Sequence, residues 1–168
     1  MTEPRKPLAS WKGQDRYFGE VLSSLTGIFL SGGCSWNRCR MCGYKNDRDT
    51  CAKDELIDHM KGQILWMQEN YAPDEYQLGK IFTSGSVFDQ NEVPLEVLDA
   101  FGEFFAGKPL IAESRSEYIT ENALARLLKS RSVLKRRMIP SGRSRSIKET
   151  RSPISSKLPR RRITQASA

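Results

Sequence analysis

Apolar positions between residues 24 and 129 follow two patterns, short β-branched or aromatic runs and longer stretches with helical spacing. The short runs are bounded by glycine, proline or serine and predict buried strands at Ser24–Ser31, Gln77–Ser84 and Pro109–Ser114. The longer stretches repeat apolar residues every three or four positions and predict helices at Lys53–Asn70, Pro94–Phe105 and Thr120–Lys129. This alternation of strand and helix predicts an α/β fold with a parallel sheet, and the short connections suit a segment of a barrel.

The periodic pattern is confined to the middle of the chain. We expect residues 1–15 to be a flexible N-terminus, residues 16–129 to be the folded core and residues 130–168 to be a basic tail of low order. Two interpretations of the tail are open: a native disordered segment, or the product of a shifted reading frame or misjudged gene end. The second is favoured because the composition changes abruptly where a fourth strand is due, which leaves a sheet edge uncovered.

The distribution of charged residues also changes near residue 129. The chain holds 27 Lys+Arg and 20 Asp+Glu, and residues 129–168 account for 13 of the basic residues and one acid. Residues 1–128 therefore hold 14 basic and 19 acidic residues, a net charge of −5, against +12 for the rest. The whole-chain charge of +7 consequently gives no argument for nucleic-acid binding by the core. The N-terminus is too polar for a signal peptide and no apolar run approaches the roughly 20 residues of a membrane span, so we expect a cytoplasmic protein without a membrane partner.

Three of the four cysteines, Cys34, Cys39 and Cys42, stand within nine residues after the first predicted strand. Thiols so close together make a poor disulfide framework, and in a chain without an export signal they more often bind metal. Two kinds of site are open. A [4Fe–4S] cluster held by three thiolates keeps one iron free for a substrate or cofactor, whereas a structural zinc ion needs a fourth ligand, for which Cys51 and His59 are the candidates.

Three stretches carry a family resemblance: residues 33–47 (GCSWNRCRMCGYKND), residues 81–94 (IFTSGSVFDQNEVP) and residues 113–120 (ESRSEYIT). With the order of strand, cysteine loop, helix and strand, they resemble the radical S-adenosylmethionine (SAM) superfamily, and within it the radical SAM family of archaeosine biosynthesis. The first cysteine spacing is one residue longer than the superfamily's commonest pattern, as in branches akin to the Elongator catalytic subunit. The resemblance covers residues 26–128 and implies the N-terminal part of a radical SAM partial (β/α)6 TIM-like barrel.

The resemblance also implies a site at the C-terminal ends of the strands, where the functional groups of such barrels gather. Cys34, Cys39 and Cys42 would hold a [4Fe–4S] cluster whose free iron binds the amino and carboxylate groups of SAM. The implied SAM contacts are Met41 and Tyr44 at the adenine, Ser84, Gly85 and Ser86 at the amino group, and Glu113, Ser114 and Arg115 at the ribose or carboxylate. No catalytic residue is implied beyond the cluster ligands.

The implied reaction is reductive cleavage of SAM to methionine and a 5′-deoxyadenosyl radical, used in tRNA modification. Archaeosine would form by cleavage of a carbon–nitrogen bond in a lysine-conjugated deazaguanine, with that tRNA, an archaeosine synthase subunit and an electron donor as partners. Two other functions stay open from the residues alone: a small zinc-binding, RNA-associated module that adds Cys51 to the three cysteines, and an inactive fragment of the enzyme. Trp36, Asp89 and Glu92 are assigned to packing or to the surface.

Overall fold

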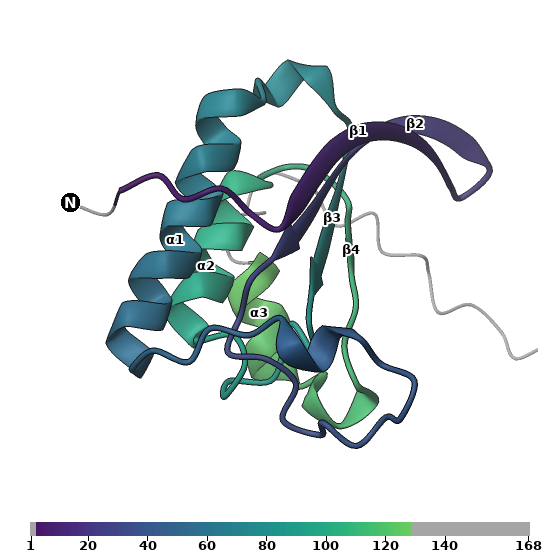
Figure 1. Ribbon diagram of the computed structural model, residues 1–168. Helices are drawn as coiled ribbons and strands as arrows, with labels where there is room; N and C mark the ends of the chain where they lie inside the picture. The colour runs from purple at the N-terminus through teal and green to yellow at the C-terminus, as the bar shows by residue number, and fades with distance from the viewer. Residues whose placement is uncertain (1–2, 129–168) are drawn as a thin grey trace, which may run out of the picture. The chain divides into compact units, whose positions relative to one another are not determined.

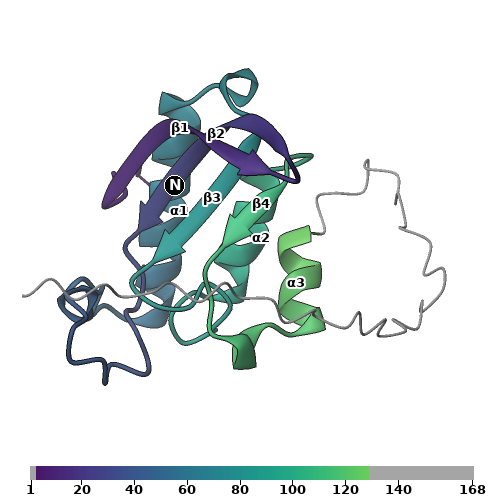
Figure 2. The ribbon, with the colours of Figure 1, turned by 90° about the vertical axis from the view of Figure 1, so that its right-hand side faces the viewer.

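The computed structural model describes residues 3–128 of the chain. Its elements are strands β1 (Ala9–Tyr17), β2 (Glu20–Phe29), β3 (Leu78–Thr83) and β4 (Leu110–Ala112), helices α1 (Lys53–Asn70), α2 (Leu95–Phe104) and α3 (Glu121–Leu128), and 3₁₀ turns at Tyr44–Asn46, Pro73–Glu75 and Ser116–Tyr118. The strands form one sheet in the order β1-β2-β3-β4. The three helices lie on one face of this sheet (Figure 1), and Figure 2 looks onto the opposite face. The described chain is thus a two-layer α/β unit.

The predicted alternation of strands and helices is confirmed. Strands β2, β3 and β4 run parallel, with β2 paired to β3 from Ser24↔Leu78 to Phe29↔Thr83. Each of the three predicted helices is present, with ends that differ from the prediction by one residue at most. Because the parallel strands point the same way, the loops that follow them emerge at one edge of the sheet (Figure 1). Closure of this sheet into a partial barrel stays a prediction.

The N-terminal segment differs from the flexible stretch predicted for residues 1–15. Ala9–Tyr17 forms β1, which pairs with β2 in an antiparallel hairpin along its whole length. The two turn residues, Phe18 and Gly19, both have positive φ angles, 48° and 91°, as a type I′ hairpin turn requires. The prediction was wrong here because β1 is polar and lies at the edge of the sheet, so it lacks the apolar alternation of a half-buried strand.

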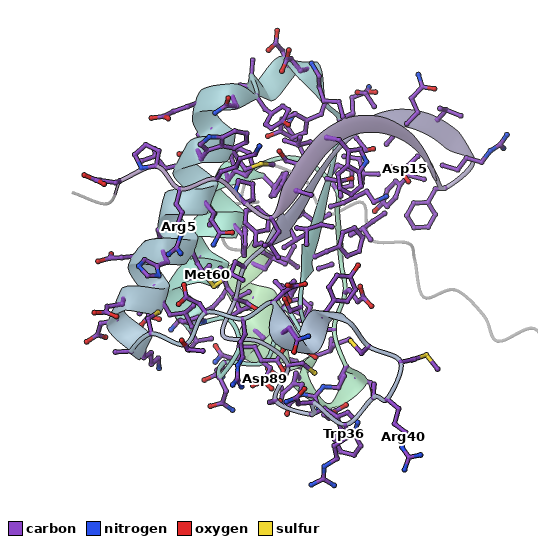
Figure 3. The ribbon with its side chains drawn as sticks, viewed as in Figure 1. Arg5, Asp15, Trp36, Arg40, Met60 and Asp89 are labelled. Carbon is purple, nitrogen blue, oxygen red and sulfur yellow. The ribbon has the colours of Figure 1, made fainter. Side chains whose placement is uncertain are left out.

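The hydrophobic core fills the space between the sheet and the helices. Leu56, Met60 and Ile64 recur once per turn along α1 and are 6% exposed or less (Figure 3 labels Met60). Phe29 of β2 is fully buried, and its ring meets that of Phe101 of α2 edge-on with centroids 4.7 Å apart. Burial of one such side chain contributes about 1.5–3 kcal/mol, so this layer holds the strands that carry the loops.

One polar side chain in the core fixes the end of β2. Gln63 of α1 is fully buried. Its Oε1 accepts the Leu30 N–H at 2.8 Å and its Nε2 donates to the Leu30 carbonyl at 2.9 Å. The amide pairs with Leu30 as a neighbouring strand would, because it supplies both a donor and an acceptor. This reciprocal pair sets the point at which β2 passes into the cysteine loop.

Two further expectations concern the tail and membranes. The basic tail predicted for residues 130–168 lies outside the described residues. Among residues 3–128, no helix has the length and apolarity needed to cross a bilayer.

Candidate cofactor site

The predicted site residues gather at the edge of the sheet where the parallel strands end. The loop after β2 carries Cys34, Cys39 and Cys42, the turn after β3 contains residues 84–86, and residues 113–115 follow β4. All three segments line one cavity of about 290 Å³. The parallel topology explains this meeting, since the carboxyl ends of parallel strands share one edge of a sheet.

The cavity brings together ten of the eleven residues predicted for the site. The residues that line it are Cys34, Trp36, Cys39, Cys42, Tyr44, Thr83, Ser84, Gly85, Ser86, Glu113, Ser114 and Arg115. Met41 is the predicted residue that does not line it, and its side chain is 96% exposed. Trp36, which the sequence placed in packing, lines the cavity with its ring 5.3 Å from the Arg38 guanidinium. Figure 3 shows Trp36 and Arg40 projecting from the loop at this end of the molecule.

The spacing of the three loop thiols bears on the kind of metal they could hold. Cys34, Cys39 and Cys42 also share a smaller hollow with Asn37. Among the described residues, Cys34, Cys39 and Cys42 do not form a group whose donor atoms all lie within 4.8 Å of one another, so at least one pair of these thiols is farther apart than that. One tetrahedral zinc ion, with Zn–S bonds of about 2.3 Å, would hold thiolates about 3.8 Å apart. In an iron–sulfur cluster, separate iron atoms each take one thiolate, so the thiols need not lie that close together.

Cys51, the fourth thiol of the zinc alternative, does not join the other three. It lies just before α1, and its Sγ is 3.6 Å from Nδ1 of His59. Neither Cys51 nor His59 lines the cavity. Burial and the neighbouring carboxylates of Asp49 and Glu55 raise the pKa of the Cys51 thiol to about 11, which keeps it protonated at neutral pH.

Two buried carboxylates that the sequence did not single out hold the loops of the cavity together. Glu92 is 1% exposed and accepts the backbone N–H of Ser35 at 2.6 Å with one oxygen and that of Ser86 with the other. Asp89 is equally buried and accepts the Ser35 hydroxyl at 2.7 Å. Glu92 therefore connects the cysteine loop, one residue beyond Cys34, to the turn after β3.

Arg115 connects the third loop to the same carboxylates. Its Nη2 lies 3.2 Å from the Asp89 carboxylate and 3.3 Å from that of Glu92. Its Nε donates to the Ser86 hydroxyl at 3.1 Å, and its guanidinium lies 4.6 Å from the centre of the Tyr118 ring. One cation thus faces two buried anions, and removing it would leave both without their shared partner. Contact between Arg115 and SAM stays a prediction.

These contacts also set the protonation of Asp89. Burial alone would raise the pKa of its carboxyl group. Hydrogen bonds from Ser35, from the Asn91 backbone and from Tyr118, together with the Arg115 charge, outweigh that effect and lower the pKa below the ordinary value of 3.8. Asp89 is therefore ionised at neutral pH, as its role in the network requires.

The turn after β3 needs glycine because the cysteine loop passes directly over it. A Cβ atom at Gly85 would overlap the Glu92 carboxylate and would lie 3.0 Å from Cα of Cys34. The neighbouring Ser84 hydroxyl donates to the Asp47 carbonyl, at the far end of the cysteine loop. The Ser-Gly-Ser turn is thus hydrogen-bonded directly to the far end of the cysteine loop at Asp47 and joined to its start at Ser35 through Glu92.

Comparison with known proteins relates the chain to two archaeal proteins. No described protein family and no solved structure matches it. The chain is 38% identical over 125 residues to archaeosine synthase subunit beta of Methanosarcina acetivorans, a match that covers 69% of this chain and 35% of that protein. It is 31% identical over 146 residues to an uncharacterised protein of Methanocaldococcus jannaschii, a match that covers 77% of this chain and 38% of that protein. The chain therefore spans little more than a third of the length of these curated relatives and is a homologue of archaeosine synthase subunit beta over the matched stretch.

Proposed function

We propose that this chain is the cluster-binding and SAM-binding part of a radical SAM enzyme that acts in archaeosine formation. The observation that carries the proposal is a single cavity lined by the three closely spaced thiols and by the loops after β3 and β4. The homology to archaeosine synthase subunit beta supports the link to archaeosine. Because the chain covers about a third of that relative, the assignment of the complete reaction to this protein is also a proposal.

In this proposal Cys34, Cys39 and Cys42 hold a [4Fe–4S] cluster. When bound, the cluster supplies the electron that breaks a carbon–sulfur bond of SAM. The chain's own part is to orient the cofactor and to exclude water from it. Both serine hydroxyls of the turn after β3 have partners within the protein, Ser84 with the Asp47 carbonyl and Ser86 with Arg115.

The amino group of SAM, whose N–H groups remain donors when its nitrogen binds iron, is therefore assigned to the exposed carboxylate of Glu113 and to backbone carbonyls of the turn after β3. Glu113 lines the cavity, and its carboxylate can accept a hydrogen bond from such an N–H group. Arg115, which two buried carboxylates already engage, is assigned to positioning the loops. The SAM contacts thus fall chiefly on Tyr44, Glu113 and Ser114.

We further infer that the substrate is a tRNA with a lysine-conjugated deazaguanine, from which cleavage of a carbon–nitrogen bond yields archaeosine. An archaeosine synthase subunit and an electron donor would act with the chain. Residues 1–128 carry 14 basic and 19 acidic residues, a net charge of −5, which does not favour RNA binding by this core. RNA binding is therefore assigned to elements outside the core.

Anaerobic reconstitution of the full chain with iron and sulfide tests the cluster. The native chain is expected to take up about four irons, Cys39→Ala to lose them, and Cys51→Ala, the matched control, to keep them. Addition of SAM should change the electron paramagnetic resonance spectrum of the reduced cluster. Iron retained by Cys39→Ala, or lost equally from Cys51→Ala, would contradict the ligand assignment, and a spectrum insensitive to SAM would contradict the assigned cofactor.

The zinc-binding, RNA-associated module is the weaker candidate. It would need Cys51 beside the three loop thiols, and Cys51 contacts His59 away from the cavity. We therefore prefer the cluster.

A further inference from the structure

Three metal-binding side chains of different kinds meet at the start of α1, apart from the cofactor cavity. Asp49 and Cys51 lie on the segment that leads into the helix, and His59 lies in its second turn. His59 Nδ1 is 2.7 Å from Oδ2 of Asp49 and 3.6 Å from Sγ of Cys51. All three donor atoms lie within 4.8 Å of one another. Among the described residues, no other group of three histidine, cysteine or acidic side chains has its donor atoms this close together.

Backbone contacts hold the donors in place. The Asp49 N–H donates to the Ser31 carbonyl at 2.8 Å, which ties this segment to the end of β2. Oδ1 of Asp49 accepts the Cys51 N–H at 3.2 Å, which leaves Oδ2 to face His59. The third donor comes from the first half of α1, whose buried face is packed in the core. The group is thus assembled from two anchored segments rather than from one mobile loop.

The geometry does not suit a nucleophilic cysteine. In a relay of thiol, imidazole and carboxylate, the nucleophile and the acid bind opposite ring nitrogens, so that the ring can pass a proton between them. Here the Cys51 thiol and the Asp49 carboxylate both face Nδ1 of His59. Donors that converge on one point suit a single ion instead.

The distances fit a tetrahedral metal of zinc size. Zinc bonds of about 2.0 Å to imidazole nitrogen and about 2.3 Å to sulfur place those two atoms about 3.5 Å apart at the tetrahedral angle. The observed separation between Nδ1 of His59 and Sγ of Cys51 is 3.6 Å. The Asp49 carboxylate would withdraw from the ring by about 0.6 Å to reach a tetrahedral position. Little more than a side-chain adjustment would complete the coordination.

We propose that Asp49, Cys51 and His59 form a second metal site, which binds Zn²⁺ or a similar borderline-soft divalent ion with water at the fourth position, the Cys51 thiol releasing its proton to solvent as the metal–sulfur bond forms. The side chains of Asp49 and His59 are 10% and 36% exposed, so an ion can enter from solvent. Arg5, which lies beside α1 (Figure 3), places Nη1 3.4 Å from Oδ2 of Asp49, and the metal would take over this contact. The ion would fasten the end of the cysteine loop to α1.

Zinc titration of the full chain by calorimetry tests the site, with Cys34, Cys39 and Cys42 all replaced by alanine so that the loop thiols cannot contribute. This chain is expected to bind a single zinc ion. His59→Ala or Cys51→Ser on the same background should weaken binding at least about 100-fold, more than the loss of an outer-shell partner does. Asp54→Asn, an exposed acid in the first turn of α1, is the matched control and should leave the affinity unchanged.

One spectroscopic and one analytical measurement test the metal site even if a variant in the titration is unstable. Co²⁺ in place of zinc should give a thiolate-to-cobalt charge-transfer band that Cys51→Ser abolishes. In the chain with the loop cysteines intact and the cluster reconstituted, Cys51→Ser should remove one zinc per chain and leave the iron content unchanged. Absence of zinc binding, or binding indifferent to both His59→Ala and Cys51→Ser, would overturn the proposal. Either result is independent of the proposed cluster, whose ligands are other residues.

Discussion

Glu92→Gln tests whether the buried carboxylate network holds the cofactor cavity together. Each oxygen of Glu92 accepts a backbone N–H, one from Ser35 and one from Ser86, and one oxygen also lies 3.3 Å from Arg115. Glutamine has nearly the same shape but only one oxygen. Its NH₂ group must therefore face one of the two N–H donors, which loses its partner. The substitution also leaves Asp89 as the one carboxylate of the pair that faces Arg115.

The expected cost follows from these contacts. A hydrogen bond to a charged acceptor contributes about 1.5–3 kcal/mol, and a buried donor left unpaired costs about 1–3 kcal/mol. The ion pair with Arg115, whose side chain is 26% exposed, adds less because solvent screens it. We expect the free energy of unfolding to fall by about 3 kcal/mol, a change of roughly 100-fold in the unfolding equilibrium.

Urea unfolding followed by tryptophan fluorescence measures this change. Glu96→Gln, an exposed acid in the first turn of α2, is the matched control and should shift the free energy of unfolding by less than about 0.5 kcal/mol. Iron uptake by Glu92→Gln should also fall, because Ser35 loses its anchor beside Cys34. A stability change no larger than that of the control would refute the view that Glu92 fixes the cysteine loop.

Three further predictions concern single side chains. Phe18, 91% exposed with a positive φ, should be replaceable by asparagine with a gain of about 0.5–1 kcal/mol, because asparagine tolerates this conformation in a type I′ turn; an unchanged thermal midpoint would argue against that turn. The Tyr76 hydroxyl is buried and without a hydrogen-bond partner among the described residues, so Tyr76→Phe should keep or raise the free energy of unfolding by up to about 1 kcal/mol. A clear loss in urea unfolding would show that the hydroxyl is paired. Because folding lowers the pKa of Asp89, its charge contributes stability above the unfolded-state pKa that is lost as pH falls through the folded value. Asp89→Asn should therefore flatten the acid side of the curve of stability against pH, and an unaltered slope would contradict the assigned protonation.

The elements that the sequence predicted correctly are those in which local pattern and tertiary environment agree. Helix α1 carries its buried residues at helical spacing, and β2 and β3 are apolar because the helices cover them. Strand β1 was not predicted because an edge strand buries few of its side chains. Its position depends on backbone pairing with β2 rather than on its own apolar pattern. The parallel strands were found at the predicted places but with other bounds: β2 begins four residues before the predicted Ser24, where it pairs with the polar β1, and β4 is shorter than predicted.

The candidate cofactor site shows the same difference between residues that the sequence predicts and residues that it does not. The cysteine loop, the turn after β3 and the residues after β4 could be placed together from the sequence, because parallel strands end at one edge. Asp89 and Glu92 could not, because acids between a strand and a helix are usually solvated. Their burial depends on Arg115, which lies 26 residues beyond Asp89. The presence of two acids three residues apart, shortly after the Ser-Gly-Ser turn, could have indicated a shared role. The sequence alone did not show that Arg115 is their common partner.

The β1–β2 hairpin sets an order of events in folding. Its two-residue turn closes the shortest possible loop, and hairpins of this kind form within about 1–10 μs. Pairing of β2 with β3 instead joins Ser24 to Leu78 across a segment that contains the whole cysteine loop and α1. That closure costs more chain entropy and comes later, so the turn at Gly85 reaches Cys34 only in the second step. The cavity lined by both loops is therefore completed late in folding, after the first strand pair has formed.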